Sequence, residues 1–82
     1  MIVLDGRRMT DREQLHAELK RKLALPEYYG NNLDALNDCL DERRERELIV
    51  VENAGEFLES CEGYALKLLR LFGDHGLQVL LD

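Results

Sequence analysis

Hydrophobic residues divide the chain into short strand-like runs and longer stretches with helical spacing. Three runs are predicted to be strands, namely Met1–Leu4, Leu48–Val51 and Leu77–Leu81, and Leu48–Val51 is a continuous run of residues that favour strands. A continuous apolar run is typical of a strand covered on both faces, so the central run is predicted to be buried on both sides. Strands that alternate with helices predict parallel pairing through right-handed crossovers.

The first helical stretch is predicted to begin at a capping box formed by Thr10 and Glu13, and Pro26 is predicted to end it. Its apolar stripe repeats every four residues: Leu15, Leu19 and Leu23. Glu18 and Lys22 have the spacing of a favourable ion pair on the outer face of this helix.

Two more helices are predicted between the second and third strands. The first is short, covers residues 53–60 and has Asn53 as a weak cap. The second is longer, covers residues 64–72 and is closed by Gly73 or Gly76.

This order of elements predicts a single α/β domain over residues 1–82, with a three-stranded parallel sheet packed with about four helices. One core is expected to unite apolar positions from all elements: Val3, Leu15, Leu19, Leu33, Leu36, Leu40, Ile49, Val51, Leu68, Phe72 and Val79. A domain of this size has a small core.

A further helix begins at Leu33 and has one apolar side and one acidic side. Its apolar positions are Leu33, Leu36 and Leu40, and its acidic positions are Asp34, Asp38 and Asp41, with Asn37 between them. Like charges four residues apart destabilise a helix by about 0.2–0.5 kcal/mol per pair. The acidic row therefore suggests a surface that meets positive charge, although exposed helix faces are commonly charged and Asp34 also suits the helix dipole.

A loop of residues typical of exposed segments precedes this helix: Tyr28, Tyr29, Gly30, Asn31 and Asn32. Gly30 can adopt positive φ, and Asn31 or Asn32 is expected to cap the helix. Aromatic residues beside charges that can be desolvated are typical of interface hot spots.

The stretch Leu23–Leu40, LALPEYYGNNLDALNDCL, resembles the helix and loop of the barstar family, intracellular inhibitors of the secreted bacterial ribonuclease barnase. The resemblance continues more weakly upstream through Leu15-His16 and downstream to Asp82. It implies the same three-stranded α/β architecture. It also implies that this surface plugs a ribonuclease active site, with acidic residues in the places of RNA phosphates.

The partner-binding residues predicted from the acidic face and the resemblance are Tyr28, Gly30, Asn32, Leu33, Asp34, Asn37, Asp38, Asp41 and Glu42. Asp38 lies in the middle and can offer two oxygens to cationic groups. The sequence departs from barstar at Asn37 and Arg43, where barstar has tryptophans, and at Leu71, where barstar has a binding glutamate. Arg43 with its neighbours Arg44 and Arg46 is interpreted as a solvated turn paired with Glu42, Glu45 and Glu47.

Composition narrows the class of function. The 82 residues carry 11 basic and 17 acidic side chains, for a net charge of −6, which disfavours nucleic-acid binding and favours a cationic partner. No membrane span and no signal region are seen, so a cytoplasmic location with Cys39 and Cys61 reduced is expected. His16 and His75 lack a catalytic partner, so His16 is interpreted as a structural or surface histidine, and His75 suits a helix C-terminus.

No enzyme motif, cofactor motif or metal site is predicted, because helical aspartates supply oxygens along one edge without enclosing a cation. The favoured hypothesis is a non-enzymatic inhibitor, monomeric when free, that blocks a barnase-like, guanyl-type ribonuclease through the acidic helix and the Tyr/Gly/Asn loop. The alternative is an orphan domain of the same fold that binds another cationic protein in a regulatory role.

Overall fold

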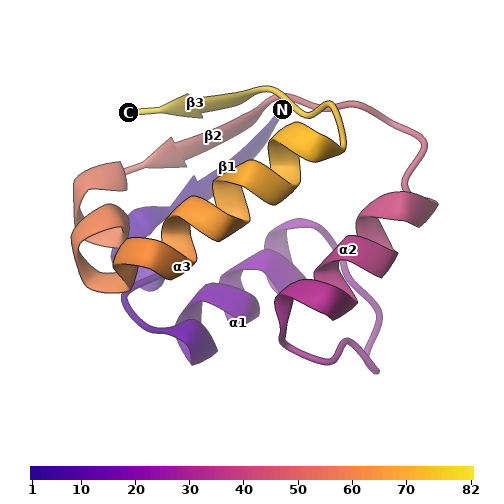
Figure 1. Ribbon diagram of the computed structural model, residues 1–82, viewed down its shortest axis with the longest axis horizontal. Coiled ribbons are helices and arrows are strands. Elements are labelled where there is room, and N and C mark those ends of the chain that lie inside the picture. Colours follow the sequence, from indigo (N-terminus) through magenta and orange to yellow (C-terminus); the bar gives the residue numbers. More distant parts are fainter.

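The structure, a computed structural model, describes residues 1–82 and contains three parallel strands in one sheet and three α-helices (Figure 1). In chain order the elements are β1 (Ile2–Asp5), the 3-10 helix η1 (Gly6–Arg8), α1 (Arg12–Lys22), α2 (Leu33–Glu42), β2 (Ile49–Glu52), α3 (Ala54–Asp74) and β3 (Val79–Leu81). The α/β class and the parallel three-stranded sheet predicted from the sequence are confirmed.

The sheet has the order β1-β2-β3, and both neighbouring pairs are parallel. Right-handed crossovers that advance in one direction place all connecting helices on the same face of a sheet, as Figure 1 shows. Ile49 and Val51 of β2 are buried beneath the helices, whereas Val50 points to the other face and is half-buried. The prediction that this strand is covered on both faces is therefore wrong.

Sixteen buried hydrophobic residues form the core between the sheet and the helices. Most of the expected core positions are in it, and Leu33 and Val79 pack against it as half-buried side chains. Val3 is a wrong assignment, because the strand alternates and its neighbours Ile2 and Leu4 are the residues that face the helices. The fully buried Phe57 was not predicted.

The region predicted as two helices forms one element, α3, with a kink at Glu62, where φ is 30° and ψ is −112°. The structure thus has three α-helices and not about four, although the kink in α3 lies between the two predicted helices. Asn53 precedes α3 in the left-handed conformation with φ 56° and makes no side-chain cap hydrogen bond. Its amide donates to the Asp5 carboxylate of β1 instead, so the predicted Asn53 cap is wrong.

The N-cap of helix α1 lies one residue later than predicted. Asp11 is the N-cap, and its carboxylate accepts a hydrogen bond from the backbone N–H of Gln14 at 2.7 Å. The Thr10 hydroxyl donates to the Gln14 side-chain oxygen and does not cap the helix. The box of Thr10 and Glu13 is therefore wrong, because an aspartate next to Thr10 offers a competing cap.

Helices α1 and α3 end with the same backbone motif. Beyond α1, Ala24 has φ 53°, and the N–H of Leu25 donates to the Lys20 carbonyl at 3.0 Å. Gly76 takes the equivalent position after α3 with φ 73°, as one of the two predicted alternatives. Helix α1 thus ends at Lys22 through the left-handed residue Ala24, so Pro26 is not what ends it.

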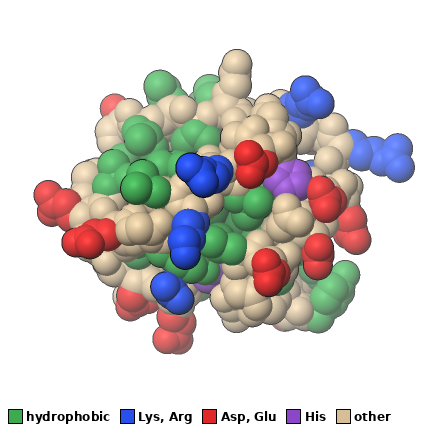
Figure 2. All heavy atoms as spheres, in the orientation of Figure 1, with side chains coloured by type: hydrophobic (Ala, Val, Ile, Leu, Met, Phe, Trp, Pro, Cys, Tyr) green, Lys and Arg blue, Asp and Glu red, His purple; other side chains and the backbone are tan.

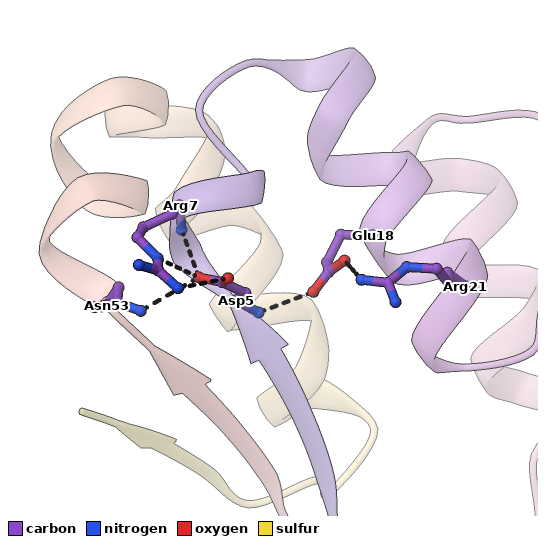
Figure 3. Close-up of polar contacts among 5 residues, drawn as sticks. All are labelled: Asp5, Arg7, Glu18, Arg21 and Asn53. Atoms are coloured by element: carbon purple, nitrogen blue, oxygen red, sulfur yellow. Dashed lines mark hydrogen bonds and ion pairs between the residues drawn. The ribbon is translucent and has the colours of Figure 1, made fainter.

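A polar cluster joins the carboxyl ends of β1 and β2 to α1 (Figure 3). Buried Glu18 accepts hydrogen bonds from the backbone N–H of Asp5 and from the Arg21 guanidinium. The predicted outer pair of Glu18 with Lys22 is therefore wrong. Hydrogen bonds from the Arg7 side chain and backbone lower the pKa of Asp5. The cluster satisfies its own charges and fixes the strand ends against α1.

Gly6 is expected to tolerate no larger residue. A Cβ there would lie 2.3 Å from the backbone oxygen of Asn53, whereas Gly55 has open space. Gly6→Ala should therefore lower the free energy of unfolding by about 1–3 kcal/mol or more, as expected for overpacking against backbone. The matched control Gly55→Ala should be neutral or stabilise by up to about 1 kcal/mol. Urea unfolding of both variants checks this, and equal stabilities would contradict the close approach.

Candidate protein-binding face

Helix α2 presents carboxylates to solvent because its leucines are held on the other side. The Asn32 side chain accepts a hydrogen bond from the Ala35 N–H at 2.7 Å and caps the helix, as predicted. Leu36 and Leu40 are buried in the core. The exposed acidic side chains are Asp34, Asp38, Asp41 and Glu42. Figure 2 shows acidic side chains gathered on the side of the molecule that α2 forms.

Asp34 and Asp38 form no ion pair within the chain. Asp41 differs, since its carboxylate lies 3.5 Å from the His75 imidazole. The middle of the face therefore offers carboxylates whose hydrogen-bonding capacity is left to water or to a partner.

The loop before α2 combines one exposed and one buried tyrosine. Tyr28 is 85% exposed, whereas Tyr29 is only 6% exposed, so the interpretation of Tyr29 as an exposed loop residue is wrong. Positive φ occurs at Asn31, with φ 55°, and not at Gly30 as expected. The Asn32 amide donates to the Gly30 carbonyl at 3.2 Å, which ties the loop to the helix cap.

A buried hydrogen-bonded chain fixes this loop to the rest of the fold. His16 Nδ1 lies 2.7 Å from the Tyr29 hydroxyl, and His16 Nε2 lies 2.6 Å from the Tyr64 hydroxyl of α3. Tyr29 in turn donates to the Asn32 carbonyl at 3.4 Å. Burial lowers the pKa of His16, with a contribution from Arg12, and raises the pKa of Tyr29. A neutral His16 with one donor and one acceptor nitrogen satisfies this chain.

His16 is therefore a structural residue, one of the two interpretations given for it. The sequence offers no local signal for its role, because Tyr29 is 13 and Tyr64 is 48 residues away along the chain.

The three departures from the barstar pattern lie around the acidic face. Asn37 is half-buried and contacts His75, which comes from the end of α3. Leu71 lies with Asn37 along a shallow depression between α2 and α3 of about 200 Å³. Arg43 donates to the Leu23 carbonyl at 2.8 Å and to Glu47, so it anchors the segment after α2 to α1. The predicted pairing of Arg43 with Glu47 is confirmed, but Arg43 is half-buried, so the interpretation of it as a solvated side chain is wrong.

The predicted binding residues form a continuous strip along the loop and α2. Seven of them are exposed, namely Tyr28, Gly30, Asn32, Asp34, Asp38, Asp41 and Glu42, and two are half-buried, Leu33 and Asn37. Sequence reasoning missed His75, because only the fold brings the end of α3 against the middle of α2.

No group of three or more His, Cys, Asp or Glu side chains is placed to hold a metal ion. No helix is both long enough and apolar enough to cross a membrane. Cys39 and Cys61 are unpaired, and burial raises the pKa of both thiols. The exposed carboxylates of α2 and the exposed Tyr28 beside them form the candidate protein-binding face.

The chain belongs to the barstar family: the family model described as "Barstar (barnase inhibitor)" matches residues 1–79. It is also similar to YrdF of Bacillus subtilis (strain 168), a protein whose name gives it as a candidate ribonuclease inhibitor. The two are 59% identical over 39 residues, which is 48% of this chain and 43% of YrdF. The similarity thus spans less than half of either chain.

Proposed function

We propose that this chain is a non-enzymatic inhibitor that blocks the active site of a barnase-like, guanyl-type ribonuclease. The observation that carries the proposal is the strip of exposed carboxylates on α2 beside the 85% exposed Tyr28. Membership of the barstar family supports ribonuclease inhibition in general. The name of YrdF points in the same direction.

The mechanism is charge substitution. A ribonuclease active site holds cationic side chains that grip a phosphodiester, and Asp38 can accept two charge-assisted hydrogen bonds from such groups. Asp34 and Asp41 flank Asp38 one helical turn away on either side. Tyr28 supplies an aromatic anchor at the edge, while Gly30 and Asn32 offer backbone and amide groups. The net charge of −6 would speed encounter with a cationic enzyme, less so at high salt.

The residues that replace barstar contacts favour a target other than barnase. The Arg43 guanidinium already donates hydrogen bonds to the Leu23 carbonyl and the Glu47 carboxylate, and Leu71 is apolar where barstar has a carboxylate. Asn37 is held by His75. These substitutions also keep open the second candidate, an interaction domain that binds a different cationic protein.

The test is inhibition of RNA cleavage by two ribonucleases: the guanyl-type enzyme secreted by the source organism, and barnase. The cognate enzyme should lose activity in proportion to added inhibitor, with one chain per enzyme at saturation. Barnase at nanomolar inhibitor should be weakly inhibited or not inhibited. Potent inhibition of barnase would show that the acidic helix and the loop suffice, and that the substitutions at Asn37, Arg43 and Leu71 do not set the target.

Absence of both binding and inhibition with every guanyl-type ribonuclease tested would contradict the proposal. Capture of a cationic protein without ribonuclease activity, lost on substitution of Asp38, would then favour the second candidate.

A further inference from the structure

His75 places a titratable imidazole ring against the acidic face. It follows α3 as the C-cap residue, and its side chain is 15% exposed. Its Nε2 lies 2.8 Å from the side-chain oxygen of Asn37, and its Nδ1 lies 3.5 Å from a carboxylate oxygen of Asp41. One imidazole therefore contacts two consecutive turns of the helix proposed to bind the partner.

Both ring nitrogens of His75 face oxygen acceptors. A neutral imidazole carries one N–H, so it can donate to Asn37 or to Asp41 but not to both. In the neutral form that donates to Asn37, the lone pair of Nδ1 faces the Asp41 carboxylate. In the protonated form both nitrogens donate, and a positive charge lies beside Asp41. The two charge states of His75 therefore differ in whether the ring donates a hydrogen bond to the Asp41 carboxylate.

Other charged side chains lie around His75. Asp74 precedes His75 at the end of α3. The depression that His75 lines is also lined by charged side chains from the end of α2 and the segment after it: Asp41, Arg43, Arg44, Glu45 and Arg46. Carboxylates and guanidinium groups ordinarily do not change charge between pH 5.5 and 8, whereas a histidine ordinarily does. The second histidine, His16, is buried between two tyrosines with a lowered pKa.

We propose that His75 is a proton-controlled counterion of the acidic face, and that it makes partner binding depend on pH. Protonated His75 holds Asp41 and cancels part of the negative charge that a cationic partner would meet. Neutral His75 releases the Asp41 carboxylate while it keeps Asn37 in place. The inference rests on the proposed function, and His75 acts in it as a positioning residue.

The experiment measures the Kd for the cognate ribonuclease at pH 5.5, 6.5 and 7.5 and constant ionic strength, for the parent chain and His75→Gln. Glutamine can still donate to Asn37 but carries no charge. At pH 5.5 the variant should bind about three- to fivefold more tightly than the parent, the size expected for an exposed ion pair. At pH 7.5 the two should agree within about twofold. Titration of groups on the ribonuclease cancels in the ratio of the two Kd values.

A second pair of variants tests the role of Asp41. In the Asp41→Asn background, His75→Gln should change the Kd by nearly the same factor at every pH, because the carboxylate that the protonated imidazole holds is gone. A ratio for the parent pair that does not change with pH, or one that persists without Asp41, would overturn the proposal.

A measurement without a partner separates this inference from the proposed function. The carboxyl carbon signal of Asp41 and the side-chain amide signal of Asn37 should follow the titration of the His75 ring by NMR in the parent. Both signals should be flat over the same pH range in His75→Gln. If they are flat in the parent too, the inference fails even where a ribonuclease binds. If no ribonuclease binds at any pH, the proposed function fails while this coupling is still tested.

Discussion

Asp38→Ala is expected to weaken binding to the cognate ribonuclease by roughly 30-fold or more and to leave the fold intact. Truncating one member of a buried, hydrogen-bonded charge pair typically costs 2–5 kcal/mol or more, a range drawn from measured interfaces that include barstar with barnase. Within the free chain Asp38 is exposed and joins no ion pair. Alanine is also the better helix former, so stability should be unchanged or slightly raised.

Titration against the ribonuclease and thermal melting of the same variant separate the two effects. Glu59→Ala is the matched control, because it removes one exposed carboxylate from the first half of α3, away from α2. Asp38→Asn keeps the shape and removes only the charge, so it should lose nearly as much affinity as Asp38→Ala. Unfolding of Asp38→Ala, or an affinity equal to that of the parent, would show that Asp38 is structural or peripheral.

Leu36→Ala is expected to lower the free energy of unfolding by about 2–5 kcal/mol, the range for large-to-small changes in a core. Leu36 is fully buried, with 0% of its surface exposed, on the side of α2 opposite its acids. Leu66→Ala is the control, because Leu66 on α3 is 64% exposed and its loss should stay within about 0.5 kcal/mol. Chemical denaturation of both variants decides it. A Leu36→Ala cost as small as that of the control would reverse the assigned faces of α2.

Local patterns in the sequence predicted the parts of the fold that local physics decides. Leu36 and Leu40 fall on one side of α2 and the exposed acids on the other, because helical spacing alone separates them. The Asn32 cap and the Gly76 terminus follow from residue types that suit those backbone positions. The same spacing predicted which carboxylates would be exposed on the candidate face.

Long-range contacts decided the features that the sequence did not reveal. Tyr29 lies in a segment whose composition is typical of an exposed loop, yet it is buried in the core, where its hydroxyl contacts His16. Glu18 has the spacing of a surface ion pair, but the backbone N–H of Asp5 captures its carboxylate. Helix spacing says nothing about a partner from a strand or from another helix, so neither contact could be read from its own segment.

The one-sided sheet shows how topology limits such predictions. An apolar run such as Leu48–Val51 suits a strand covered on both faces, but the order β1-β2-β3 sends both crossovers to one side. Val50 is therefore left half-buried on the open face. Strand order is a property of the whole chain, and no window of the sequence contains it.

The buried chain of hydroxyl and imidazole contacts from Tyr64 through His16 to Tyr29 has a kinetic consequence. A free loop rearranges within nanoseconds to microseconds, but movement of the Tyr28 loop would strip a buried polar group of its partner, at a cost of about 1–3 kcal/mol. The loop is therefore presented to solvent mainly in one shape before any encounter. Association with a partner should then need no slow rearrangement, and its rate should be governed by diffusion and ionic strength.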